Sequence, residues 1–168
     1  DYLAYLGRSD PSPLSVIADL AEYVEQFKGE KVSSGDDRIV YLTEQCDEVH
    51  DDGTKRRTLH QVYRVLTEEG ANRYRRFPAW YDGDTEEIRF RKARVLHASG
   101  SISEAQIVPI PRPGDRQVTV AVFPALGKGD VIETEYVVIQ TRPNFFGDYF
   151  GHIHRFRKFS PVRLSRYI

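Results

Sequence analysis

The chain has 168 residues, of which 40% are hydrophobic and 29% are charged, a balance typical of one globular domain rather than of a disordered segment. Its formal net charge of −1 gives no overall field that favours nucleic acid or an acidic membrane, and its single cysteine excludes an internal disulfide and a multi-cysteine zinc site. No run of about 18 apolar residues is present, so no segment is expected to insert into a membrane.

The N-terminal segment SPLSVIADLAEYVEQFKG predicts a helix over residues 13–27, because its apolar residues recur with a 3.6-residue period. Ser12 suits the N-cap of this helix and Gly29 suits its C-terminal end. We therefore expect a helical lead-in over residues 1–29 and a linker over 30–37, an order that suits the end of an upstream helical element. The chain lacks an initial Met and stops within a strand-like pattern, so we expect a longer parent polypeptide.

From Arg38 onward the hydrophobic period changes from 3.6 to two, which indicates strands. The alternating runs are separated by polar turns such as DDG (51–53), EEG (68–70) and the Ser-Gly step at 99–100. Such spacing predicts about eight or nine strands and no helix after the lead-in. The expected fold class is therefore mostly β, an antiparallel β-sandwich over residues 38–168 with an N-terminal helix.

Three segments of the strand region carry a family resemblance: VYRVLTEEGANRYRRFPAWYD (62–82), EEIRFRKARVLHASGSISE (86–104) and the stretch from VFPALGKGD to VRLSRY (122–167). The most specific marker is Pro-x-Leu-x-x-Gly-Asp-Val-Ile-Glu-x-x-Tyr, from Pro124 to Tyr136. On these residues, the chain resembles the bacterial domain of unknown function that lies N-terminal to transglutaminase-like domains. HASGS (97–101) replaces the usual Pro-Asp-Gly turn of that family.

The resemblance implies a β-sandwich that occurs in exported or envelope proteins, so the periplasm or cell envelope is the expected location. It also implies a non-catalytic accessory module that packs against a transglutaminase-like domain further along the same chain, or against a partner protein, with the arginine-rich C-terminal strands in the interface. That family has no activity of its own to carry over. We therefore expect neither a catalytic residue nor a cofactor in this chain.

The stretch FFGDYFGHIHRFRKFSPVRL (145–164) contains the sharpest chemical pattern. On a strand, His152 and His154 share a face and could bind a metal, but two ligands are too few for a zinc site, so no metal is expected. Arg155 and Arg157 alternate with aromatic residues without forming a clean stacking platform, which argues against nucleic acid. We interpret these four residues as binding candidates on a strand that meets solvent or a neighbouring domain.

A second candidate surface is FPAWYDGD (77–84), which contains the only tryptophan of the chain. Exposed aromatic residues on a loop of a β-sandwich can anchor a partner protein or a glycan, so Trp80 and Tyr81 are binding candidates. This pattern supports an alternative function, a stand-alone binding domain for a partner protein or an envelope glycan. The competing interpretation is that both side chains pack under the edge of a sheet.

Three further patterns resemble reactive sites but favour structural roles. GKGD (127–130) precedes a strand rather than a helix, so it predicts a turn in which Gly127 or Gly129 has positive φ and Asp130 caps the turn. Cys46 follows Glu44 and precedes two further acids, which should raise the pKa of its thiol and keep it unreactive.

Glu133 and Glu135 lie two residues apart and so share one face of a strand. Paired carboxylates can act as acid and base when their pKa values differ. We expect instead an exposed, solubilising face on which they pair with Arg89, Arg91 and Arg94 across strands.

Overall fold

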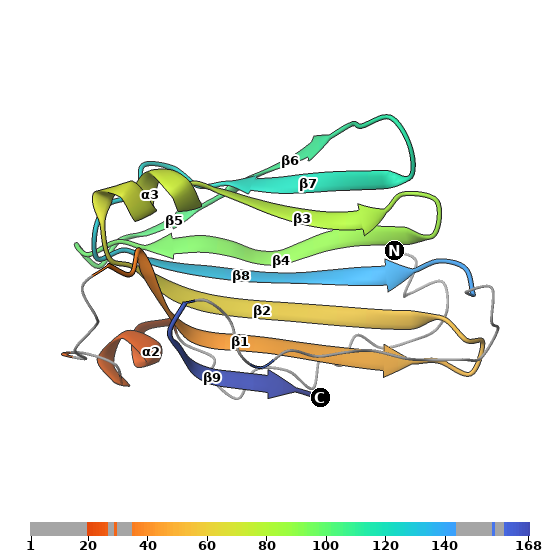
Figure 1. Cartoon of the computed structure of the whole chain (residues 1–168), viewed down its shortest axis with the longest axis horizontal. Helices are drawn as coiled ribbons and strands as arrows, with labels where there is room; N and C mark the ends of the chain where they lie inside the picture. Colours follow the sequence, from red (N-terminus) through yellow and green to blue (C-terminus); the bar gives the residue numbers. More distant parts are fainter. Residues whose placement is uncertain (1–19, 27–28, 30–34, 144–155, 157–159) are drawn as a thin grey trace.

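A computed structural model describes residues 20–26, 29, 35–143, 156 and 160–168. This part of the chain forms two helices and nine strands, whose arrangement can be followed in Figure 1. In chain order, they are α2 (Leu20–Gln26), β1 (Arg38–Val49), β2 (Lys55–Val65), α3 (Glu68–Tyr74), β3 (Arg76–Asp82), β4 (Glu86–Leu96), β5 (Ile102–Glu104), β6 (Gln106–Ile110), β7 (Arg116–Val122), β8 (Val131–Gln140) and β9 (Val162–Tyr167).

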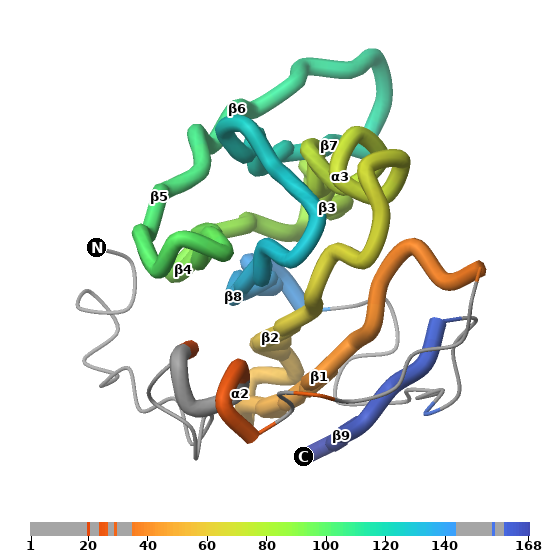
Figure 2. The backbone as a smooth tube through the Cα atoms, turned by 90° about the vertical axis from the view of Figure 1, so that its left-hand side faces the viewer, coloured from red at the N-terminus to blue at the C-terminus, as the bar shows by residue number. Residues whose placement is uncertain are grey.

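The strands form a six-stranded sheet of order β5-β4-β8-β2-β1-β9 and a three-stranded sheet of order β3-β7-β6. Every pair is antiparallel except β1 with β9, which run parallel. Ala105 separates β5 from β6, and its N–H donates to the carbonyl of Ala93. The chain therefore passes directly from the larger sheet into the smaller one, on the side of the molecule where Figure 2 labels β5 and β6.

One hydrophobic cluster contains residues of both sheets. Val65, Val95 and Ile132 of the larger sheet are fully buried together with Ala121 of β7. Phe77 of β3 makes edge contacts with two rings of the larger sheet, at centroid distances of 6.4 Å to Phe90 and 5.7 Å to Tyr136. The two sheets therefore share a single core.

The larger sheet carries a second hydrophobic cluster, to which α2 contributes. Leu20 is 3% exposed and clusters with Leu42, Val62 and Val131, while Val24 packs against the same group. This short helix is the described part of the segment predicted as helical over residues 13–27. The rest of that helix and linker residues 30–34 lie outside the described residues.

The helix α3 was not expected, because EEG (68–70) was interpreted as a turn. Thr67 is extended and its side chain accepts the N–H of Gly70 at 2.9 Å, which caps the helix, and Glu68 and Glu69 lie in the first turn. A Cβ on Gly70 would lie 2.6 Å from the carbonyl oxygen of Asp37, so only glycine fits there. The expectation of no later helix is therefore wrong.

The mostly β class is confirmed, and strands follow from Arg38 onward as the alternating pattern predicted. Two strands were missed. FPAWYD was interpreted as a loop but forms β3, and QIVPI forms β6. Each contains a proline and each lies at an edge of the smaller sheet, where a missing N–H is tolerated.

Candidate functional site

Trp80 and Tyr81 lie on strand β3 rather than on a loop, which corrects the sequence-based expectation. Because neighbouring residues of a strand point to opposite faces, the two rings do not form one aromatic pair. Trp80 is 39% exposed, and Tyr81 is partly buried. His152, His154, Arg155 and Arg157, the other predicted binding candidates, lie outside the described residues.

Two arginines cover the ring of Trp80. The guanidinium carbon of Arg112 lies 5.1 Å from the ring centroid, and that of Arg116 lies 4.7 Å from it. Both distances are within the range of cation–π attraction. Beside them is an open hollow of about 340 Å³ lined by Trp80, Tyr81, Asp82, Asp115 and Arg116. The structure therefore places the predicted aromatic residue in a concave, mixed-charge environment.

Backbone hydrogen bonds hold the walls of this hollow. The N–H of Gly83 donates to the carbonyl of Asp115 at 2.6 Å, which ties the turn after β3 to the residue before β7. A Cβ on Gly83 would lie 2.5 Å from the side chain of Gln117, so the approach requires glycine. Gln117 in turn donates to the carbonyls of Arg112 and Gly114, which fixes the turn that carries Arg112.

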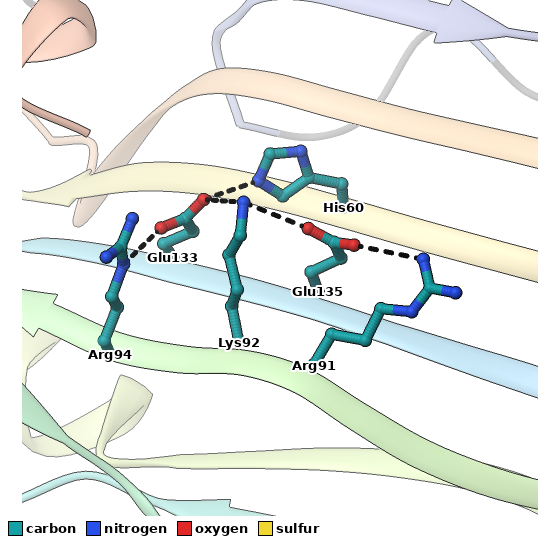
Figure 3. A network of polar contacts seen from close by, with 6 residues as sticks. All are labelled: His60, Arg91, Lys92, Arg94, Glu133 and Glu135. Carbon is teal, nitrogen blue, oxygen red and sulfur yellow. Dashed lines mark hydrogen bonds and ion pairs between the residues drawn. The ribbon is translucent and has the colours of Figure 1, made fainter. Parts of the chain in front are cut away.

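The second polar region is a buried network on the larger sheet, drawn in Figure 3. Glu133 and Glu135 of β8 are 3% and 6% exposed, so the expectation of an exposed, solubilising face is wrong. Glu133 accepts from Arg94 at 2.6 Å and pairs with His60 at 2.9 Å. Lys92 lies between the two carboxylates, at 3.3 Å from Glu133 and 3.1 Å from Glu135.

The expected cross-strand pairing with arginines is present in part. Arg94 binds Glu133, and Arg91 lies 3.5 Å from Glu135, whereas Arg89 pairs with Glu87 on its own strand. The row continues across the sheet, since Glu44 of β1 lies opposite His60 and pairs with Arg166 of β9. Polar or charged side chains from five neighbouring strands therefore meet in one row.

The charge state of Glu133 follows from these contacts. Burial by itself raises the pKa of the carboxyl, but the hydrogen bonds from His60 and Arg94, with the charges of Lys92 and Arg94, outweigh it and lower the pKa to about 2. A carboxylate held ionised in this way is a poor proton donor or acceptor near neutral pH. The network therefore favours a structural role over acid–base chemistry.

A third cluster, which the sequence analysis missed, is a chain of hydrogen bonds from Asp130 through His97 to Ser103. His97 Nδ1 lies 3.0 Å from Asp130 Oδ2, and His97 Nε2 lies 2.9 Å from Ser103 Oγ. This is the atom order of a serine-hydrolase triad. Ser103 lies opposite Val95, a core residue, so its side chain projects from the face of β5 that is turned toward the core.

Asp130 has additional partners that indicate what this chain of hydrogen bonds does. Its carboxylate also accepts the N–H groups of Ala98 and Gly127, at 3.0 and 2.9 Å. The predicted cap of the GKGD turn is thereby confirmed, and Gly129 is the glycine of that turn with positive φ, at 97°. We interpret the cluster as a clamp that joins the end of β4, strand β5 and the start of β8.

Cys46 is buried on β1, as a structural cysteine should be. Burial, and then the charges of Glu48, Asp47 and Glu44, raise the pKa of its thiol, which confirms the expected direction.

Among the described residues, no group of three or more His, Cys, Asp or Glu side chains could hold a metal ion. None of the helices in the described ranges is long and apolar enough to cross a membrane.

Fold and site together define a mostly β, two-sheet domain whose exposed feature is a tryptophan beneath two arginines. The chain belongs to DUF3857, a family described as a domain of unknown function with a solved structure, which matches residues 51–168. This match confirms the domain of unknown function expected from the sequence. The association with transglutaminase-like domains stays a prediction.

Among solved structures, the chain is similar to a protein from Parabacteroides distasonis ATCC 8503 that is described as a "putative protease". The two share 16% sequence identity with a TM-score of 0.59, over 65% of this chain and 24% of that one. The chain thus spans about a quarter of the length of that protein, and the likeness concerns the fold. No curated protein matches the chain.

Proposed function

We propose that this chain is a non-catalytic interaction module of a larger protein, and that a partner docks on the smaller sheet at Trp80. The observation that carries the proposal is the partial exposure of Trp80 together with the two arginines that cover its ring. The residue is 39% exposed, and its ring lies under two guanidinium groups that form no ion pair with a carboxylate among the described residues. Tryptophan and arginine are the residue types most enriched at the energetic centres of protein interfaces.

The polar clusters of the larger sheet support the same proposal, because their groups bind one another. Glu133 has three cationic or hydrogen-bonding neighbours in its own sheet, and Asp130 accepts hydrogen bonds from two separate turns. Carboxylates with such partners hold neighbouring strands together and have few hydrogen-bonding positions left for a substrate. We therefore place the chemistry of the parent protein outside this domain.

Fold similarity supports the part of the proposal that makes this domain one segment of a larger protein. In the Parabacteroides distasonis protein, the matching region is 24% of a chain that is described as a putative protease. By analogy, this domain is a β-sandwich that orients or restricts a downstream domain. That downstream domain is transglutaminase-like, and the parent protein lies in the periplasm or cell envelope, as the family resemblance implies.

The mass of the native polypeptide tests this organisation. An antibody raised against the domain should detect, in lysate of the source cell, a species far larger than the domain mass of 19.4 kDa. The purified domain alone should show no hydrolase or acyl-transfer activity. A native species of about the domain mass would overturn the accessory role.

A stand-alone binding domain for a partner protein or an envelope glycan is the second candidate. The hollow of about 340 Å³ beside Trp80 favours it, because binding sites are concave. A glycan array probed with the wild-type domain and with Trp80→Ala tests the glycan version. Binding that disappears in the variant would support a glycan ligand, and an array without signal would remove it.

A further inference from the structure

One face of the smaller sheet combines apolar side chains with arginines, and its composition follows from the strand register. Trp80 of β3 lies opposite Val118 of β7, which lies opposite Ile110 of β6. Since residues two apart share a face, the next row is Pro78, Val120 and Val108. Phe77 and Ala121 have the opposite parity and belong to the core. We call the face formed by these two rows the outer face.

The exposed apolar side chains of the outer face lie on its edge strands. Trp80 and Ile110 are each 39% exposed, while Val118 between them is only 4% exposed. Two large side chains on the edge strands therefore flank a covered central strand. The hollow lined by Trp80 and Arg116 lies at the end of β3. An apolar side chain of a partner would therefore contact the exposed edge side chains rather than the covered Val118.

Arginines border the apolar rows of the outer face. Arg76 begins β3 and Arg116 begins β7, and their parity places both on the outer face, while Arg112 follows β6. All three are exposed, and among the described residues none has a carboxylate partner. The guanidinium groups of Arg112 and Arg116 lie over the ring of Trp80, and Asp82 lies opposite Arg116 in the strand register. Stacking on the ring orients these groups and leaves N–H donors for a carboxylate.

The edges of the smaller sheet indicate how a partner binds. β3 and β6 are its two edge strands, and each contains a proline, Pro78 and Pro109. A proline provides no N–H for an added strand and is a common means of protecting an edge. Recognition by backbone pairing along these edges is therefore disfavoured. The side chains of the outer face are the remaining means of recognition.

We propose that the outer face binds an acidic, apolar peptide segment, and this inference rests on the proposed interaction function. Carboxylates of the segment pair with Arg112 and Arg116, and its apolar side chains pack on the exposed parts of Trp80 and Ile110. Charge complementarity carries the choice, because three arginines without carboxylate partners border an apolar strip in a chain whose net charge is −1.

Asp82 and Asp115 line the hollow and limit which anions fit. They would repel the evenly spaced phosphates of a nucleic acid, whereas a peptide can place its charges selectively. A sugar ring would compete with two guanidinium groups for the faces of the indole. The acidic peptide is therefore favoured over both alternatives, which become outcomes of the test.

Trp80 is the only tryptophan of the chain, so intrinsic fluorescence reports on the outer face directly. A ten-residue peptide that alternates Glu with Leu and Phe is titrated into the intact domain, beside the same peptide with Gln in place of Glu. We expect a saturable change in emission with the acidic peptide, and binding at least about ten-fold weaker with the Gln peptide. The acidic peptide should also bind more weakly as salt concentration increases.

Variants show whether binding uses the outer face. Arg112→Gln and Arg116→Gln alter exposed side chains and should each weaken binding by about ten-fold. Lys128→Gln removes the same charge from an exposed turn elsewhere and should change binding by less than about two-fold.

Four results would overturn the proposal. The first two are no binding of the acidic peptide and equal binding of the Gln peptide. The other two are an affinity that is unchanged in both arginine variants and preferential binding of single-stranded DNA or an oligosaccharide. These results are independent of the native mass, which tests the larger protein separately. A small native species with intact peptide binding would contradict the accessory role alone. A large native species with no peptide binding would contradict this inference alone.

Discussion

His60 Nε2 lies 2.9 Å from Glu133 Oε1, on the central strands β2 and β8 of the larger sheet, and both side chains are almost fully buried. A buried carboxylate is costly unless charges and hydrogen bonds compensate it. Here Arg94 and Lys92 complete that compensation from the neighbouring strand β4. The pair, together with Arg94 and Lys92, therefore connects strands β2, β8 and β4 through side chains as well as through backbone hydrogen bonds.

Replacing Glu133 by Gln should destabilise the fold by about 3 kcal/mol, because Arg94 and Lys92 would lose their buried counter-charge. Urea unfolding followed by circular dichroism measures the change. Glu87→Gln is the matched control, since Glu87 is half-exposed and pairs with Arg89 on the surface of the same sheet. The control should cost less than about 0.5 kcal/mol. Equal losses of unfolding free energy in the two variants would show that the buried network stabilises the fold no more than the surface ion pair does.

Stability should fall in acid in a way that depends on Glu133. Its pKa is lowered from 4.5 to about 2 in the folded chain, so the stabilisation is complete above about pH 4.5 and is lost as the pH falls toward 2. The shift corresponds to about 3 kcal/mol. Urea unfolding from pH 5 to pH 2 should therefore show a steeper loss for the wild type than for Glu133→Gln. Parallel curves would contradict the assignment.

Gly129→Ala should destabilise the domain by about 1–2 kcal/mol, because φ at this residue is 97°, a conformation that residues with a Cβ rarely adopt. Gly127→Ala, two residues earlier in the same turn, is the control. A Cβ at Gly127 would have no heavy atom within 4 Å, so the expected cost is within about 0.5 kcal/mol. Thermal denaturation of both variants tests the difference, and a larger loss at Gly127 would contradict the turn geometry.

Trp80→Ala should reduce stability by only about 1 kcal/mol, because the residue is 39% exposed and lies on an edge strand of the smaller sheet. Phe77→Ala, three residues earlier on the same strand, should cost about 3 kcal/mol, since that ring packs against Phe90 and Tyr136 between the sheets. Melting temperatures of the two variants give the comparison. If Trp80→Ala lowered the melting temperature as much as Phe77→Ala, the tryptophan would belong to the core rather than to a binding surface.

The Asp130–His97–Ser103 cluster should behave as a clamp and not as a nucleophilic site. A fluorophosphonate probe, which phosphonylates activated serines with loss of fluoride, should leave the intact mass of the domain unchanged. Asp130→Ala should lower stability by about 2 kcal/mol, because the N–H groups of Ala98 and Gly127 lose their acceptor. Probe labelling that disappears in Ser103→Ala would contradict the clamp and indicate a hydrolase.

Hydrophobic alternation was sufficient to predict the long strands, because β1, β2, β4 and β8 each continue for ten or more residues. It failed for β3 and β6, since Pro78 and Pro109 interrupt the pattern and an edge strand tolerates what a central strand does not. It also failed for α3, where the Glu-Glu-Gly sequence is as compatible with a turn as with a capped helix.

The candidate site was less predictable than the fold. The composition of FPAWYDGD singled out Trp80, but the arginines that cover its ring come from residues more than thirty positions later. Glu133 and Glu135 were assigned to solvent because acidic residues are seldom buried. Their burial depends on Lys92, Arg94 and His60, and only the register of strands β4, β8 and β2 brings those side chains within reach.

The parallel pair formed by β1 and β9 sets a constraint on the time course of folding. More than a hundred residues separate these strands, whereas β1 and β2 are joined by a short turn. On a ribosome, the β1–β2 hairpin can form long before β9 has been synthesised, and until then the outer edge of β1 lacks the strand that pairs with it. We expect nascent chains at that stage to depend on a chaperone or on rapid elongation to avoid association through this edge.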